Sequence, residues 1–101
     1  MSPAVPTKRA GQEYGVIRSF LGNGRYKVQV IPTDGSTKPY IVVGVLLNLV
    51  RTTVGDFVLV FFREPKSKEA IITRVFSRAE AEVLINRAEL PRHFDLISDD
   101  N

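Results

Sequence analysis

The side chains in this sequence whose chemistry most clearly suggests a ligand are basic and lie on one face of a single predicted strand. Residues 25–32, RYKVQVIP, alternate between polar and apolar types, with Arg25, Lys27 and Gln29 on one face. The opposite face carries Tyr26, Val28 and Val30. Such a strand turns its apolar face to a core and its polar face to water or to a ligand. Arg25 and Lys27 are therefore candidate contacts to nucleic-acid phosphates, each worth roughly one released counterion, with a solvated strand face as the alternative.

A charged loop later in the chain offers a second set of candidate contacts. Arg63, Lys66 and Lys68 lie at or beside the turn predicted between the fourth and fifth strands. In small β-barrels such a loop commonly helps to bind a nucleic acid. A charged loop that serves only solubility is an equally good interpretation.

One tyrosine is a further candidate because an exposed aromatic ring can stack on a base. If Ile41 and Val43 enter the core, the residues that alternate with them point outward, and these are Tyr40 and Val42. Stacking of Tyr40 on a base would be worth roughly 1–3 kcal/mol. Packing of the ring at a barrel end or on a helix is the favoured alternative.

The other residue types that carry chemistry are too few or too scattered to form a catalytic or metal site. Cysteine is absent, which excludes disulfides and thiol catalysis. His93 is the only histidine, and it has no nearby serine, cysteine or carboxylate pair with which to form a triad or a metal site. No phosphate-loop or dinucleotide-binding fingerprint is present. We expect no enzymatic activity, no cofactor and no metal.

The length and composition predict one small domain. The chain has 101 residues, of which 44% are hydrophobic, enough for a single core. A net charge of +3 suits a polyanionic partner without requiring one. No apolar run approaches the roughly 20 residues that span a bilayer, and the N-terminus lacks the apolar core of a secretory signal. We expect a cytoplasmic monomer with no membrane partner.

Short strands with tight turns between them must position the candidate residues. Strands are predicted near residues 14–21, 25–32, 38–45, 56–63 and 70–76, and a helix near 78–88. Ser77 and Glu80 form the capping-box pattern that begins the helix. Residues 1–12 read as a flexible tail, 13–96 as the domain, and 97–101 as a short acidic tail. The predicted fold is mainly β, a five-stranded OB-fold β-barrel with a C-terminal α-helix; an SH3-like barrel fits the periodicity almost as well.

Three segments give the sequence a resemblance to a known family. They are GQEYGVIRSFLGNGR at residues 11–25, VGDFVLVFFRE at 54–64, and SRAEAEVLINRAELPRHF at 77–94. In this order and spacing they resemble the translation initiation factor 1A family over residues 11 to about 96. The resemblance implies an S1-like OB fold with a helical extension. It also implies an RNA-binding factor, not an enzyme, that acts at the decoding site of the small ribosomal subunit and assists start-codon selection. The implied partners are small-subunit RNA, the initiator tRNA complex and other initiation factors.

The sequence is a divergent member in one loop. Where the family has a basic loop of the form G-K-x-R-K-K-x-W-I, residues 44–52 keep the glycine and only one basic residue, Arg51, a candidate RNA contact. Apolar residues replace the others: Leu46, Leu47, Leu49 and Val50. If exposed, they would form a patch for a protein partner; burial over the barrel mouth is the favoured interpretation. A divergent OB-fold protein-interaction module that has lost ribosome binding is therefore the alternative function.

Overall fold

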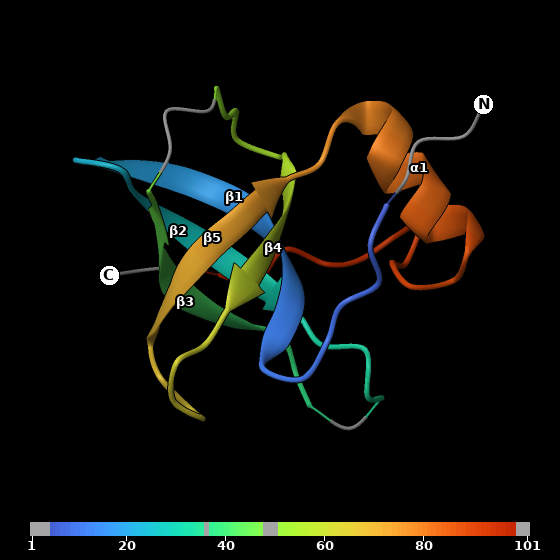
Figure 1. Cartoon of the computed structure of the whole chain (residues 1–101), viewed down its shortest axis with the longest axis horizontal. Coiled ribbons are helices and arrows are strands. Elements are labelled where there is room, and N and C mark those ends of the chain that lie inside the picture. Colours follow the sequence, from blue (N-terminus) through green and yellow to red (C-terminus); the bar gives the residue numbers. More distant parts are fainter. Residues whose placement is uncertain (1–4, 36, 48–50, 99–101) are drawn as a thin grey trace.

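The computed structural model describes residues 5–35, 37–47 and 51–98, which form a closed five-stranded barrel with a helix beyond one of its ends (Figure 1). The strands follow the order β1-β2-β3-β5-β4 around the barrel, and β3 and β5 are its parallel pair. The elements are β1 (Gln12–Gly22), β2 (Arg25–Ile31), β3 (Tyr40–Leu46), β4 (Phe57–Phe61), β5 (Glu69–Val75) and α1 (Arg78–Asn86). The predicted fold class is confirmed, and each strand lies within a few residues of its predicted bounds.

The first strand closes the barrel because it pairs along both of its edges. Tyr14, Gly15 and Val16 lie opposite β2 on one side and β4 on the other. A Cβ atom at Gly15 would lie 2.6 Å from Val28 Cγ1 and 3.1 Å from the Gln29 carbonyl oxygen. The glycine therefore lets β1 and β2 approach closely at this position. Full closure removes the unpaired edges of the sheet.

Two apolar clusters fill the molecule. One occupies the barrel interior and contains Ile17, Val28, Val30, Val42, Val58, Val60, Ala70 and Ile72. The other joins the barrel end to α1 and contains Val5, Tyr14, Val16, Ile31, Leu59, Phe76, Leu84 and Leu90. The capping box at Ser77 and Glu80 is present as predicted. The helix ends at Asn86, two residues before the predicted end, and Ala88 turns the chain with a φ of 60°.

One predicted strand face is reversed. Val42 is 2% exposed and lies in the barrel interior, whereas Ile41 and Val43 face outward and are half-buried. The condition considered for Tyr40, in which Ile41 and Val43 enter the core and Val42 points outward, is therefore not met. Gly44 shows which residues of β3 face inward, because a Cβ atom there would lie inside the barrel, 2.9 Å from both Val28 and Ile72. The close approach inside the barrel leaves room only for glycine at that position.

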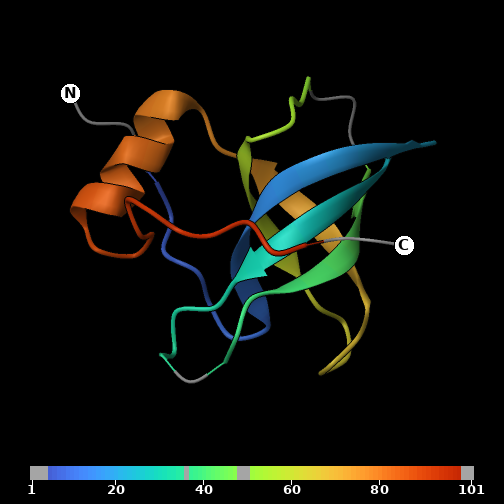
Figure 2. The same cartoon turned by 180° about the vertical axis from the view of Figure 1, so that it is seen from behind.

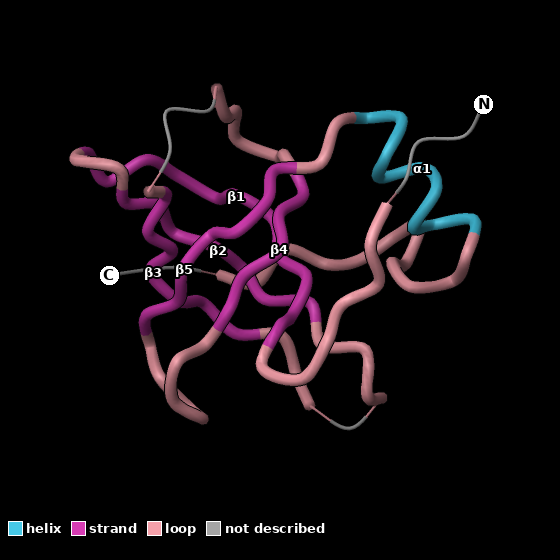
Figure 3. The backbone as a smooth tube through the Cα atoms, viewed as in Figure 1, coloured by secondary structure: helices cyan, strands magenta, loops and turns pink. Residues whose placement is uncertain are grey.

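The described part of the predicted N-terminal tail runs beside α1 (Figure 3). Val5 is 8% exposed in the second cluster. Arg87 holds this segment by donating to the Val5 carbonyl oxygen at 2.8 Å and to Thr7 Oγ1 at 2.9 Å. Flexibility of residues 1–12 stays a prediction, and these contacts argue that residues 5–11 are docked. No helix among the described residues has the length and apolar character to cross a membrane.

Candidate nucleic-acid interface

The register of the sheet places two of the candidate basic residues, Arg25 and Lys27, on its outer face and brings the backbone of a third, Lys68, close to them. Lys27 of β2 pairs with Val43 of β3, and Val43 pairs with Glu69 of β5. The Val43 amide donates to the Lys68 carbonyl oxygen at 2.9 Å, which places Lys68 beside the same pair. Arg25 lies two pairs along, opposite Val45, and forms an exposed ion pair with Glu69, with 3.4 Å between Nη2 and Oε2. Arg25 and Lys27 therefore share the outer face of β2, and Lys68 lies just before β5, two strands away.

The polar face of β2 differs from the prediction at one residue. Gln29, expected to meet water or a ligand, is completely buried, because residues 95–97 cross the outside of β2 (Figure 2). We call these residues the C-terminal strap. Gln29 Nε2 donates to the Asp95 carbonyl oxygen at 2.8 Å, and its Oε1 accepts from the Ile97 amide at 3.0 Å. Arg18 Nη1 donates to both Gln29 Oε1, at 2.7 Å, and the Ile97 carbonyl oxygen, at 2.9 Å.

Tyr40 stands at one end of β3, against another aromatic ring. Its ring centroid is 6.5 Å from that of Phe62, and 37% of the residue is exposed. Burial, together with the charges of Glu13 and Asp34, raises the pKa of the Tyr40 hydroxyl. The charges that shift this pKa are therefore acidic, and the ring packs at the barrel end with one part left accessible for stacking.

The remaining candidates lie in two loops at opposite ends of β5. Arg63 and Lys66 are exposed in the loop that leads into β5, next to Lys68. Arg51 is exposed in the loop that follows β3. Because β3 and β5 run parallel, the end of β3 lies toward the end of β5 and away from its beginning. The seven candidates therefore follow the barrel surface from one end to the other and do not form one compact cluster.

The apolar residues of the divergent loop are only partly described. Leu46 packs against the barrel core, as the favoured interpretation predicts, but Leu47 is 70% exposed. The predictions for Leu49 and Val50 fall outside the described residues.

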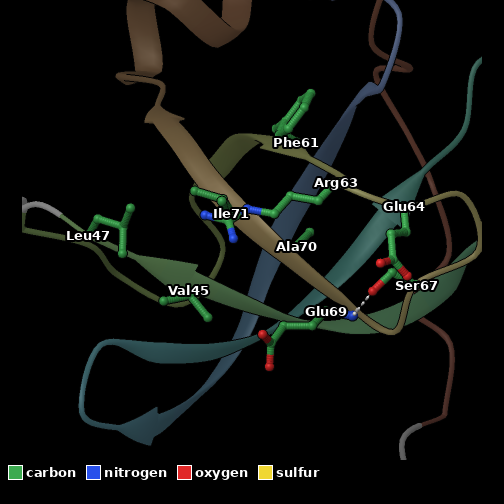
Figure 4. Close-up of a pocket in the computed structure, with 9 residues that line it drawn as sticks. All are labelled: Val45, Leu47, Phe61, Arg63, Glu64, Ser67, Glu69, Ala70 and Ile71. Atoms are coloured by element: carbon green, nitrogen blue, oxygen red, sulfur yellow. Dashed lines mark hydrogen bonds between the residues drawn. The ribbon is translucent and has the colours of Figure 1, made fainter.

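Sequence reasoning missed a hollow on the outer surface of β3, β5 and β4 (Figure 4). Val45, Ile71 and Phe61 are partners in one cross-strand row and form its floor. Leu47 lies at one rim, and the β4–β5 loop provides the other with Arg63, Glu64, Ser67 and Glu69. The hollow is open to solvent and has a volume of about 350 Å³. The signal in the sequence was the absence of polar residues from either face of β3, which is unusual for a strand exposed on one side.

Comparison with known proteins agrees with this architecture. The family model for translation initiation factor 1A / IF-1 matches residues 2–98. The protein is also similar to "Eukaryotic translation initiation factor 1A" of Triticum aestivum, with 33% identity over 84 residues. The chain belongs to the translation initiation factor 1A / IF-1 family. The match covers 83% of this chain and 57% of the wheat protein, so the chain spans little more than half the length of that relative. The predicted family resemblance is confirmed.

The structure joins two of the segments that carry the family resemblance. Tyr14, from the G-Q-E-Y segment, donates its hydroxyl to Glu89 Oε1 of the E-L-P segment at 2.6 Å. Its hydroxyl also accepts from the Lys8 amide at 3.0 Å. Arg87 Nε donates to Glu89 Oε2 at 2.6 Å. In this family member, therefore, the two segments hold the barrel, α1 and the N-terminal segment together.

This network moves two pKa values in opposite directions. Burial and the hydrogen bond to Glu89 raise the pKa of the Tyr14 hydroxyl from 10.0 to about 12. Burial by itself would raise the pKa of the Glu89 carboxyl, but hydrogen bonds from Arg87, Tyr14 and Thr7 outweigh it and lower that pKa. Both shifts favour the protonation states found at neutral pH, a neutral phenol and an ionised carboxylate.

Proposed function

We propose that this protein binds the decoding site of the small ribosomal subunit through RNA contacts and assists start-codon selection. Its membership of the initiation factor family is the observation that carries the proposal. The partners are small-subunit RNA, the initiator tRNA complex and other initiation factors, in the cytoplasm, with the protein acting as a monomer. Basic residues on the outer face of β2 and in the β4–β5 loop support the RNA contact.

Each candidate residue has a role that follows from its place on the barrel. Arg25, Lys27 and Lys68 lie where a backbone crossing β2, β3 and β5 would run, and they contact phosphates. Arg63 and Lys66 extend this track along the β4–β5 loop. Two residues stand apart from it: Arg51 contacts a separate stretch of RNA beyond β3, and Tyr40 stacks a base at the barrel end.

The loss of the family's basic loop lowers the electrostatic part of binding. The logarithm of an RNA-binding constant falls by about 0.7–0.9 per logarithmic unit of salt for every phosphate contact. With only Arg51 left in residues 44–53, we expect weaker and less salt-sensitive subunit binding than that of a relative with the full basic loop.

Co-sedimentation with isolated small subunits over a salt series tests the proposal. The double variant Arg25→Ala/Lys27→Ala should reduce the salt slope by about 1.4–1.8, because it removes two phosphate contacts. Arg78→Ala is the matched control, since Arg78 is an exposed arginine on α1, away from the proposed track. Arg51→Ala should weaken binding more than Lys38→Ala does.

The same experiment separates the proposal from the alternative of a protein-interaction module. Binding to the subunit that persists at high salt, with no change in slope for the double variant, would mean that RNA phosphates are not the partner. The exposed Leu47 favours that alternative. Changing Leu47 and Asn48 to lysine should tighten subunit binding if the loop faces RNA.

A further inference from the structure

The outer hollow has an apolar floor that the proposed RNA contacts do not explain. Its floor consists of Val45, Ile71 and Phe61, and Leu47 stands 70% exposed at its rim. Three of these four side chains are aliphatic, so they offer no hydrogen bond to a base edge and a poor stacking surface. Apolar side chains of a protein partner suit such a floor better, because burial against it removes both surfaces from water.

The charges around the hollow also argue against a polyanion. The residues that line it carry two carboxylates, Glu64 and Glu69, and one guanidinium, Arg63, on a chain whose net charge is +3. Glu69 is paired with Arg25. The Glu64 carboxylate is exposed and has no side-chain partner among the described residues. In Figure 4 it lies at the rim beside Ser67, where an arriving ligand would meet it.

We propose that the outer hollow is a docking site for a protein segment that presents apolar side chains next to a lysine or arginine. The apolar side chains cover Val45 and Ile71, and the cation pairs with Glu64. A volume of about 350 Å³ is at the lower end of the range for binding pockets and suits one or two side chains. This site adjoins the proposed RNA track, because Arg25 pairs with Val45 and Arg63 lines the hollow, but its apolar floor does not depend on ribosome binding.

Titration of the isotope-labelled full chain by NMR tests the proposal with defined probes. Two capped peptides, Gly-Lys-Leu-Leu-Lys-Gly and Gly-Glu-Leu-Leu-Glu-Gly, have the same apolar centre and opposite charge. We expect the basic peptide to shift the amides of Val45, Glu64 and Ile71 in a saturable way. It should bind about threefold more tightly than the acidic peptide, the scale of one exposed ion pair.

Three variants assign the effect to the hollow. Glu64→Lys should reverse the preference between the two peptides, and its exposed site leaves the fold intact. Val45→Thr should weaken both peptides, whereas the same change at the exposed Val54, outside the hollow, should weaken neither. An unchanged preference in Glu64→Lys, or equal binding of the two peptides, would overturn the proposal.

A short oligouridine serves as the third probe and separates the two proposals. Saturable shifts at the hollow amides with oligouridine, larger than those with the basic peptide, would identify the hollow as an RNA site and overturn the docking proposal. Shifts at the amides of Arg25 and Lys27 alone would show that oligouridine does not bind the hollow, and would support its assignment as a protein-docking site. If oligouridine shifts neither place, the RNA track loses support while the peptide result still stands.

Discussion

Two outer faces of the same barrel differ in whether another segment of the chain covers them. On β2 the outward Gln29 is completely buried, because the C-terminal strap covers it and bonds both ends of its amide. On β3 the outward Val45 keeps partial exposure, and Leu47 beyond it is 70% exposed. The polar position is therefore covered and the apolar position is open, the reverse of what hydropathy alone predicts. Burial of the polar position depends on hydrogen-bond partners that a segment distant in the sequence supplies. The exposed apolar face is available to another protein.

The largest effect should follow from removing the amide that holds the strap. Gln29→Leu eliminates three hydrogen bonds and should lower the free energy of unfolding by about 3 kcal/mol, at roughly 1 kcal/mol for each bond. Denaturant unfolding measures this loss, and hydrogen exchange at the Ile97 amide should become fast. A change below about 0.5 kcal/mol would show that the strap does not depend on Gln29.

A somewhat smaller loss in the free energy of unfolding should follow from a change at the buried Tyr14–Glu89 hydrogen bond. Tyr14→Phe removes the hydrogen bond to the Glu89 carboxylate and the one from the Lys8 amide while keeping the buried ring. A bond to a charged partner is worth about 1.5–3 kcal/mol, so we expect a loss near 2 kcal/mol in the free energy of unfolding. Chemical denaturation checks this value. Equal stability of the variant and the parent would assign the junction to apolar packing alone.

The same network predicts how stability depends on pH. The pKa of Glu89 is lowered from its ordinary 4.5, so its contribution is complete above pH 4.5 and is lost as the pH falls through the lower folded value. The pKa of Tyr14 is raised from 10.0 to about 12, so its contribution is complete below pH 10 and is lost as the pH rises toward 12.

Urea midpoints across these two pH ranges measure both effects. Glu89→Gln should flatten the acid part of the profile, and Tyr14→Phe should flatten the alkaline part. A profile of Glu89→Gln that falls in acid as steeply as that of the parent would place the acid sensitivity elsewhere, for example at Glu80, whose pKa is also lowered by hydrogen bonds from the Ser77 backbone and Arg74.

The smallest effect should come from the open face. Val45→Thr replaces a half-exposed methyl group with a hydroxyl that reaches water, so we expect a change within about 0.5 kcal/mol in the free energy of unfolding. Denaturant unfolding beside Gln29→Leu completes the comparison of the two faces. A loss as large as that of Gln29→Leu would mean that the hollow is part of the core.

The elements of the fold could be predicted from the sequence, because local patterns determine them. Alternation marked β2, and the Ser77–Glu80 capping box marked the start of α1. Which residues of β3 face the core could not be predicted, because the uniformly apolar run around Val42 contains no polar residue that would indicate the outward face. Likewise, the burial of Gln29 depends on residues 66 and 68 positions away, which no local pattern reports.

The candidate site was predictable in part for the same reason. Arg25 and Lys27 could be assigned to one face because they share a strand. Their proximity to Lys68 depends on the parallel pairing of β3 with β5, which joins segments distant in the sequence. The outer hollow likewise arises from a row of partners on three strands, and only the closed barrel aligns them.

The C-terminal strap has a consequence for the order in which the protein matures during synthesis. A barrel of this kind folds as one unit, and residues 95–97 are the last described segment to join it. All five strands and α1 precede residues 95–97, so a nascent barrel can close while Gln29 is still hydrated. Its amide loses that water only after the turn at Ala88 has directed the chain back across β2. A chain in which residues 95–97 have not yet docked would therefore present more of the outer face of β2 than the finished protein does.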